Sequence, residues 1–295
     1  MEVRPRRSVL YVPATNARAL EKAKTLAADA LIIDLEDAVA PDQKVAARRE
    51  AERVVKAGGY GPRELTLRIN GLDTPWGEDD LELAAGLGIS ALVLPKVERR
   101  GDLVRAAAAL DRSGSRARLW CMIETPRAVL DLEELAKTSP RIEALVLGTS
   151  DLSKDLRAQP GLDRGPLAYA LGKTVLVARA LGLVALDGVH LDLEDEAGFR
   201  ATTVQGRAYG FDGRTLIHPR TIEIANAIYA PSEAELASAE QVVRAHAEAA
   251  AQGKGVAVVN GKLVEALHVA AAERLLAEAK AIAARAAQIQ GTSAG

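Results

Sequence analysis

The fold is decided by two stretches that each run from apolar residues into a carboxylate: Leu119-Trp120-Cys121-Met122-Ile123-Glu124 and Ala144-Leu145-Val146-Leu147-Gly148-Thr149-Ser150-Asp151. Short apolar runs of this composition are typical of buried strands. Glu124 and Asp151 would then stand where two strands leave the core, and parallel α/β proteins build their active sites at that edge. Two such carboxylates could bind one divalent cation. Each could equally cap the helix that follows it.

Six more runs of the same kind accompany these two, and all eight alternate with stretches typical of helices, one of them over residues 126–137. Eight strands separated by eight helices predict a closed (β/α)₈ TIM barrel with parallel strands. The structural alternative, an open doubly wound sheet, calls for a Gly-rich turn after an early strand, and residues 11–16 offer none. The predicted strands are residues 8–12, 30–33, 64–69, 91–95, 118–123, 144–147, 183–186 and 213–217.

Beyond residue 230 the alternation stops. Ser232 and Glu235 have the spacing of a capping box, which predicts a helix that runs to about residue 252. Asn260-Gly261 suits the turn of a small hairpin, and an Ala-rich amphipathic helix is predicted over residues 267–290. We therefore divide the chain into a catalytic barrel, residues 1–230, and a C-terminal extension, residues 231–295. The extension either packs as a structural appendage or acts as a lid over an active site.

The overall composition excludes several classes of partner. A formal net charge of −2 gives no reason to expect nucleic acid or a membrane surface. No apolar stretch approaches the length of a membrane span. The single cysteine, Cys121, lies inside a predicted strand and cannot form an intrachain disulfide, which suits a reducing compartment. We expect a cytoplasmic protein.

Carboxylates at the predicted strand ends outnumber the basic residues there, which suits a hard cation and an anionic, carbonyl-bearing substrate. Arg68 lies within a predicted strand, where an arginine is costly to bury without an anionic partner. It could form a structural salt bridge to the carboxylates of residues 34–37, or it could bind a substrate oxygen, and we favour the second. No Ser–His pair or His/Cys zinc spacing is present, and His218 is interpreted as structural.

Eight motifs, in order along nearly the whole chain, give it a family resemblance. The chain resembles the citrate lyase β-subunit-like branch of the HpcH/HpaI aldolase/citrate lyase family, which includes malyl-CoA and citramalyl-CoA lyases. The motifs are residues 7–13, 34–39 with Lys44, 67–70, 94–98, 123–125, 148–152, 210–219 and the hairpin at 260–262.

The resemblance implies an enzyme that uses Mg²⁺, or Mn²⁺ with the same ligand preferences, on an acyl-CoA substrate. It also implies a homotrimer or a dimer of trimers in which the C-terminal lid covers a neighbouring subunit. By position, the resemblance implies that Glu124 and Asp151 bind the metal and that Arg68 stabilises the enolate or carbonyl oxygen. It implies that the site is supported by Glu36, Asp37 and Lys44. It also implies that CoA is contacted by Tyr11, Arg18 and Lys22.

The reaction that the resemblance implies is retro-aldol or Claisen cleavage of a β-hydroxyacyl-CoA such as malyl-CoA, to acetyl-CoA or propionyl-CoA plus an oxoacid. Lyases of the family typically carry an aspartate base in the C-terminal segment, where this chain has Glu265. One additional methylene changes the geometry of proton transfer. Two alternatives therefore accompany the lyase: a malyl-CoA thioesterase that uses the same metal site, and a citryl-thioester lyase subunit of a multi-enzyme complex.

Overall fold

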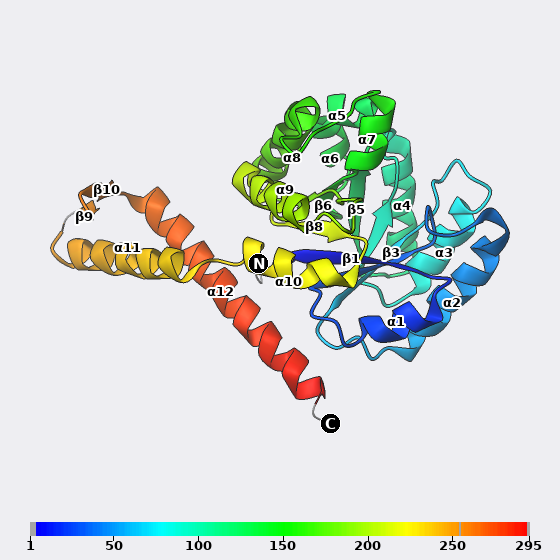
Figure 1. Ribbon diagram of the computed structural model, residues 1–295, viewed down its shortest axis with the longest axis horizontal. Coiled ribbons are helices and arrows are strands. Elements are labelled where there is room, and N and C mark those ends of the chain that lie inside the picture. Colours follow the sequence, from blue (N-terminus) through cyan, green and yellow to red (C-terminus); the bar gives the residue numbers. More distant parts are fainter. Residues whose placement is uncertain (1–3, 254, 294–295) are drawn as a thin grey trace. The chain divides into compact units, whose positions relative to one another are not determined.

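The computed structural model describes residues 4–253 and 255–293, and the chain divides into two compact units. One unit spans residues 6–229, and the other contains residues 4 and 5 together with the segment from residue 230 onward. In the first unit, eight parallel strands pair in sequence order and close with β1 against β8 (Figure 1). The predicted (β/α)₈ TIM barrel is confirmed. The strands are β1 (Ser8–Pro13), β2 (Ala30–Asp34), β3 (Glu64–Arg68), β4 (Ala91–Leu94), β5 (Arg118–Ile123), β6 (Ile142–Leu147), β7 (Val184–Asp187) and β8 (Gly213–Leu216).

Helices connect successive strands, and these crossovers keep neighbouring strands parallel. Two details differ from the predicted eight helices. The stretch over 126–137 divides at Asp131, whose backbone (φ −96°, ψ 12°) leaves the helical region. The polar residues after β6 form a short helix that the apolar periodicity did not indicate. The helices of this unit are α1 (Ala17–Ala23), α2 (Lys44–Ala57), α3 (Gly77–Gly86), α4 (Arg100–Arg112), α5 (Pro126–Leu130), α6 (Leu132–Ala136), α7 (Thr149–Asp155), α8 (Ala168–Leu181), α9 (Glu196–Tyr209) and α10 (Ile222–Tyr229), with 3₁₀ turns at Pro41–Gln43, Gly165–Leu167 and Pro219–Thr221.

Successive strand residues belong to two layers of core, because side chains alternate between the faces of a strand. Ile32, Trp120 and Met122 belong to a cluster that fills the barrel interior. Leu31 and Cys121, at the alternate positions, pack in the layer between strands and helices. Burial raises the pKa of the Cys121 thiol to about 12. The thiol is therefore a packing group and not a nucleophile.

A charged network closes the end of the barrel at which the strands begin. Arg6 Nε lies 2.6 Å from Glu64 Oε2, and Arg6 Nη2 lies 2.7 Å from Glu143 Oε2. The Arg6 guanidinium also stands 5.1 Å from the centre of the Trp120 ring, and the indole nitrogen donates to Glu143. These side chains stabilise one end of the barrel, and the opposite end carries the candidate site.

The second unit consists of two helices and a hairpin. Helix α11 (Glu233–Ala251) begins at Ser232, which forms the predicted capping box with Glu235. Strands β9 (Ala257–Val259) and β10 (Lys262–Val264) pair antiparallel across Asn260 and Gly261, and both turn residues have the positive φ of a type I′ turn. Helix α12 (Ala266–Ser293) packs against α11. Within the described residues, no helix combines the length and the apolar character needed to cross a bilayer.

Candidate active site

A cavity of about 360 Å³ lies where the barrel strands end. Its walls come from β1 and from the ends of β2, β3, β5, β6, β7 and β8, so segments far apart in the sequence meet there. Five of the residues singled out in the sequence line this one cavity: Tyr11, Asp37, Arg68, Glu124 and Asp151.

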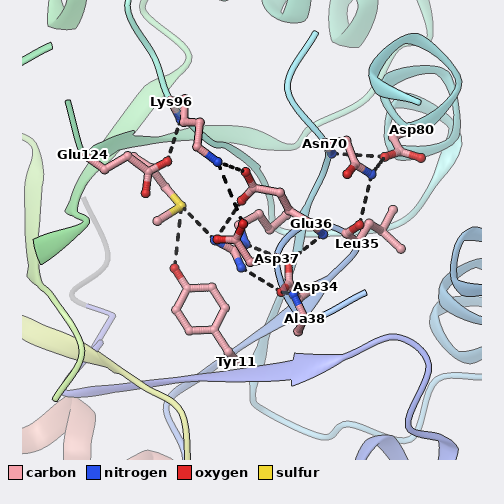
Figure 2. A network of polar contacts seen from close by, with 12 residues as sticks. Tyr11, Asp34, Leu35, Glu36, Asp37, Ala38, Asn70, Asp80, Lys96 and Glu124 are labelled. Atoms are coloured by element: carbon pink, nitrogen blue, oxygen red, sulfur yellow. Dashed lines mark hydrogen bonds and ion pairs between the residues drawn. The ribbon is translucent and has the colours of Figure 1, made fainter. Parts of the chain in front are cut away.

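Arg68, the last residue of β3, is 6% exposed and is held by a bidentate ion pair. Its Nε and Nη2 donate to the two oxygens of Asp34, each at 2.7 Å, and its guanidinium stacks 4.7 Å from the centre of the Tyr11 ring. The remaining nitrogen, Nη1, lies 2.9 Å from Glu36 Oε2 and 3.3 Å from Asp37 Oδ2 (Figure 2). The structural salt bridge considered above is thus present, and Nη1 is the nitrogen that faces Glu36 and Asp37 instead of Asp34.

The loop after β2 is held in place by hydrogen bonds from Lys44 and Asn70 to its backbone carbonyl oxygens. Lys44 Nζ donates to the carbonyl oxygens of Leu35 and Glu36, at 2.8 and 2.7 Å. Asn70 Nδ2 donates to the Leu35 carbonyl at 3.0 Å and to Asp80 at 2.6 Å (Figure 2). Lys44 therefore supports the backbone that presents Glu36 to Arg68 and does not itself line the cavity.

Glu124, directly after β5, is 2% exposed and its oxygens have different surroundings. Oε1 accepts a hydrogen bond from the backbone N–H of Lys96 at 2.7 Å. Oε2 lies over Gly148, where an added Cβ would come within 2.5 Å of it, so a larger residue at 148 would displace the carboxylate. Burial, reinforced by the negative charges of Glu36 and Asp151, raises the pKa of Glu124 to about 7. Burial and the neighbouring carboxylates therefore outweigh the positive charge of Arg68 at this site.

The composition of the cluster fits a divalent cation. Five carboxylates face three basic side chains, which leaves a formal excess of two negative charges when every carboxyl group is ionised. No group of three or more His, Cys, Asp or Glu side chains with metal-binding geometry occurs among the described residues. A cation here would therefore complete its shell with water and substrate oxygens, as Mg²⁺ commonly does. The charged residues are Asp34, Glu36, Asp37, Glu124 and Asp151 against Lys44, Arg68 and Lys96.

Three of the predicted site residues lie elsewhere. Arg18 and Lys22 are exposed one turn apart on α1, on one helix face, and do not line the cavity. Glu265 is exposed in the second unit, between β10 and α12, where its backbone N–H donates to Nδ1 of His268. Tyr11 does line the cavity, but its ring is occupied by stacking on Arg68. The contacts of Tyr11, Arg18 and Lys22 with CoA remain predictions. So does the role of Glu265 in proton transfer.

Two contacts of the site were not anticipated from the sequence. Asp34 was noticed only as a member of the acidic run at 34–37, although it is the principal partner of Arg68. Lys96 enters the sequence analysis only as part of the motif at residues 94–98, although it contacts both Glu124 and Glu36. The only sequence signal for either residue was its position at a strand end.

The sequence matches the family described as HpcH/HpaI aldolase/citrate lyase over residues 7–219, which covers the eight barrel strands and every residue that lines the cavity. Among curated proteins, a (3S)-malyl-CoA thioesterase of Cereibacter sphaeroides is 47% identical over 283 residues, which span 96% of this chain and 98% of that protein. An L-malyl-CoA/beta-methylmalyl-CoA lyase of the same species is 31% identical, over 95% of this chain and 96% of that protein.

A solved structure shows the same fold over most of the chain. Protein CitE of Mycobacterium tuberculosis, in complex with magnesium, acetoacetate and coenzyme A, superposes with a TM-score of 0.76 at 29% identity. The match covers 94% of this chain and 98% of CitE.

Proposed function

The chain belongs to the HpcH/HpaI aldolase/citrate lyase family, and on that premise we propose that it hydrolyses the thioester of (3S)-malyl-CoA to malate and free CoA. The observation that carries the proposal is the 47% identity to a (3S)-malyl-CoA thioesterase over nearly the full length of both chains. The lyase of the same species is 31% identical. The motifs favour the lyase reaction over hydrolysis, whereas the higher identity to the thioesterase favours hydrolysis.

We propose Glu124 and Asp151 as the protein ligands of Mg²⁺, a role that Mn²⁺ would also fill. Both carboxylates line the cavity, and the cluster around them has an excess of negative charge. When bound, Mg²⁺ would stabilise negative charge that develops on a substrate oxygen. CitE, 29% identical to this chain, was solved with magnesium and coenzyme A, which supports the metal and the CoA moiety of the substrate.

Hydrolysis requires a water oxygen to bond to the thioester carbon and the carbon–sulfur bond to break. A base takes the proton that water loses and passes it to the departing thiolate. Nη1 of Arg68 faces Glu36 and Asp37 at the cavity wall. In this position it can donate to the carbonyl oxygen as negative charge builds on it. The bidentate pair with Asp34 keeps the guanidinium from turning away.

The proton acceptor that we propose is Glu265. Its carboxylate is exposed on the second unit, at the junction of the hairpin and α12. In a homotrimer or a dimer of trimers, this unit would act as a lid that brings Glu265 over the cavity of a neighbouring subunit. Arg18 and Lys22, exposed on α1, would then contact the phosphates of CoA.

The proposed reaction is tested by identifying the products formed from (3S)-malyl-CoA and Mg²⁺ with purified protein, using chromatography with mass detection. We expect malate and free CoA in equal amounts, without glyoxylate. Acetyl-CoA with glyoxylate would refute hydrolysis and establish the second candidate, carbon–carbon cleavage. That candidate is favoured by Arg68, whose Nη1 could equally stabilise an enolate oxygen.

Glu265→Ala is expected to lower kcat by about 10²-fold and to change KM little, because a general base acts in the transition state and contributes little to substrate binding. Glu265→Gln, which keeps the size and loses the basicity, should behave like the alanine variant. Steady-state kinetics on both variants is the measurement, and Glu273→Gln, an exposed change on α12, is the control. An unchanged kcat in both Glu265 variants would remove this residue from the mechanism.

A second experiment tests whether Glu265 acts on the cavity of a neighbouring subunit. Subunits with Glu124→Gln lack the metal site, and subunits with Glu265→Ala lack the base. If the base comes from a neighbouring subunit, co-refolding of the two inactive variants should restore part of the activity in mixed oligomers. Absence of any restoration in oligomers shown to be mixed by mass spectrometry would contradict the lid in trans.

A further inference from the structure

Lys96 has an unusual backbone conformation for its residue type. It follows Pro95 after β4, and its φ of +46° lies in the left-handed region that favours glycine. A non-glycine residue persists there when its surroundings compensate for the strain, and such residues cluster at functional sites. Lys96 contacts Glu124, which lines the cavity, and Glu36, which pairs with the cavity residue Arg68.

The backbone of Lys96 contacts Glu124. In this left-handed conformation the Lys96 N–H donates to Glu124 Oε1 at 2.7 Å (Figure 2). Gly148 leaves room for the other oxygen, Oε2, on the opposite side. Because β4 and β5 are neighbouring strands, this contact joins the ends of both. The carboxylate is thus oriented by a backbone donor and does not depend on a flexible side chain.

The side chain of Lys96 makes an independent contact. Its Nζ lies 2.6 Å from Glu36 Oε1, and the other oxygen of Glu36 lies 2.9 Å from Arg68 Nη1 (Figure 2). Glu36 is therefore shared between two cations. The ammonium neutralises part of the charge of Glu36, and Arg68 Nη1 is correspondingly less committed to that carboxylate.

We propose that Lys96 is a positioning residue with two separable actions. Its backbone N–H, presented by the left-handed conformation, orients Glu124 for a divalent cation. Its ammonium holds Glu36 so that Arg68 Nη1 meets the substrate. The first action requires only the proposed metal site, and the second rests on the proposed function.

A matched pair of variants isolates the backbone action. Lys96→Gly and Lys96→Val both remove the ammonium, but only glycine adopts a φ of +46° readily, since a β-branched residue strongly disfavours it. Mn²⁺ affinity, measured by electron paramagnetic resonance of the free ion, needs no substrate. We expect the glycine variant to bind Mn²⁺ within about threefold of wild type and the valine variant to bind at least about tenfold more weakly. Circular dichroism melts establish that both variants are folded.

A second pair isolates the ammonium. Lys96→Met should lower kcat about tenfold or more while leaving Mn²⁺ affinity unchanged, and Lys96→Arg, which restores a cation beside Glu36, should recover most of kcat. A merely structural role would instead move stability and metal affinity together in the methionine variant.

The outcomes of these experiments distinguish failure of the Lys96 proposal from failure of the proposed metal site or of the proposed reaction. Equal Mn²⁺ affinity in the glycine and valine variants would overturn the backbone action, and full turnover in the methionine variant would overturn the side-chain action. Should valine at 96 prevent folding, Lys96→Ala against Lys96→Gly keeps the comparison. Failure of the wild-type protein to bind Mn²⁺ would refute the proposed metal site together with the backbone action. Binding without turnover of malyl-CoA would refute the proposed function alone.

Discussion

Glu124→Gln is expected to lower kcat by about 10³-fold or more, since a bound metal contributes several kcal/mol to transition-state stabilisation. The amide keeps the shape of the side chain but cannot supply a charged ligand. Thermal unfolding without metal should change little or shift upward, because burial, reinforced by the negative charges of Glu36 and Asp151, raises the pKa of Glu124 to about 7 and makes the charged form costly. Turnover and calorimetric melting are the two measurements.

Asp151→Asn should produce the same loss of turnover and an equal loss of Mg²⁺ affinity. Glu98→Gln is the matched control, because Glu98 also follows a strand but is exposed and does not line the cavity. It should retain wild-type kinetics. Wild-type turnover in the Glu124 or Asp151 variant would remove that residue from the proposed metal site.

Arg68→Met is expected to reduce both turnover and stability. The variant loses the donor that faces the substrate, which costs about 10²–10³-fold in kcat for a comparable oxyanion donor. It also leaves Asp34, 1% exposed, without its bidentate partner. Breaking a buried pair in this way costs about 3–5 kcal/mol of unfolding free energy. Urea unfolding and steady-state kinetics measure the two losses.

A double variant distinguishes the catalytic role of Arg68 from its structural one. Arg68→Met combined with Asp34→Asn removes both buried charges and keeps a side-chain acceptor for the backbone N–H groups of residues 36 and 38, so part of the lost stability should return. Activity should not return, because the donor at Nη1 is still absent. Recovery of turnover together with stability would show that Arg68 acts only through the salt bridge.

The parallel barrel was predictable because its signal is local. Each apolar run has the length of one strand, and each connection has the length and composition of a helix, so counting eight of each was sufficient. The place of Glu124 and Asp151 followed, since the carboxyl ends of all strands meet at one end of a barrel. Local reasoning was less successful at Asp131 and at α7, where short polar helices show little apolar periodicity.

By itself, the sequence determined that carboxylates and Arg68 gather at one end of a barrel. Only the tertiary structure decided which of them touch. Asp34 and Arg68 are 34 residues apart in the chain and meet because the register of β2 against β3 places them opposite each other. The Lys96 N–H reaches Glu124 because β4 lies beside β5, and Lys96 has a positive φ there. Both contacts depend on the pairing of strands that are distant in the sequence, so no local pattern of residue types encodes them.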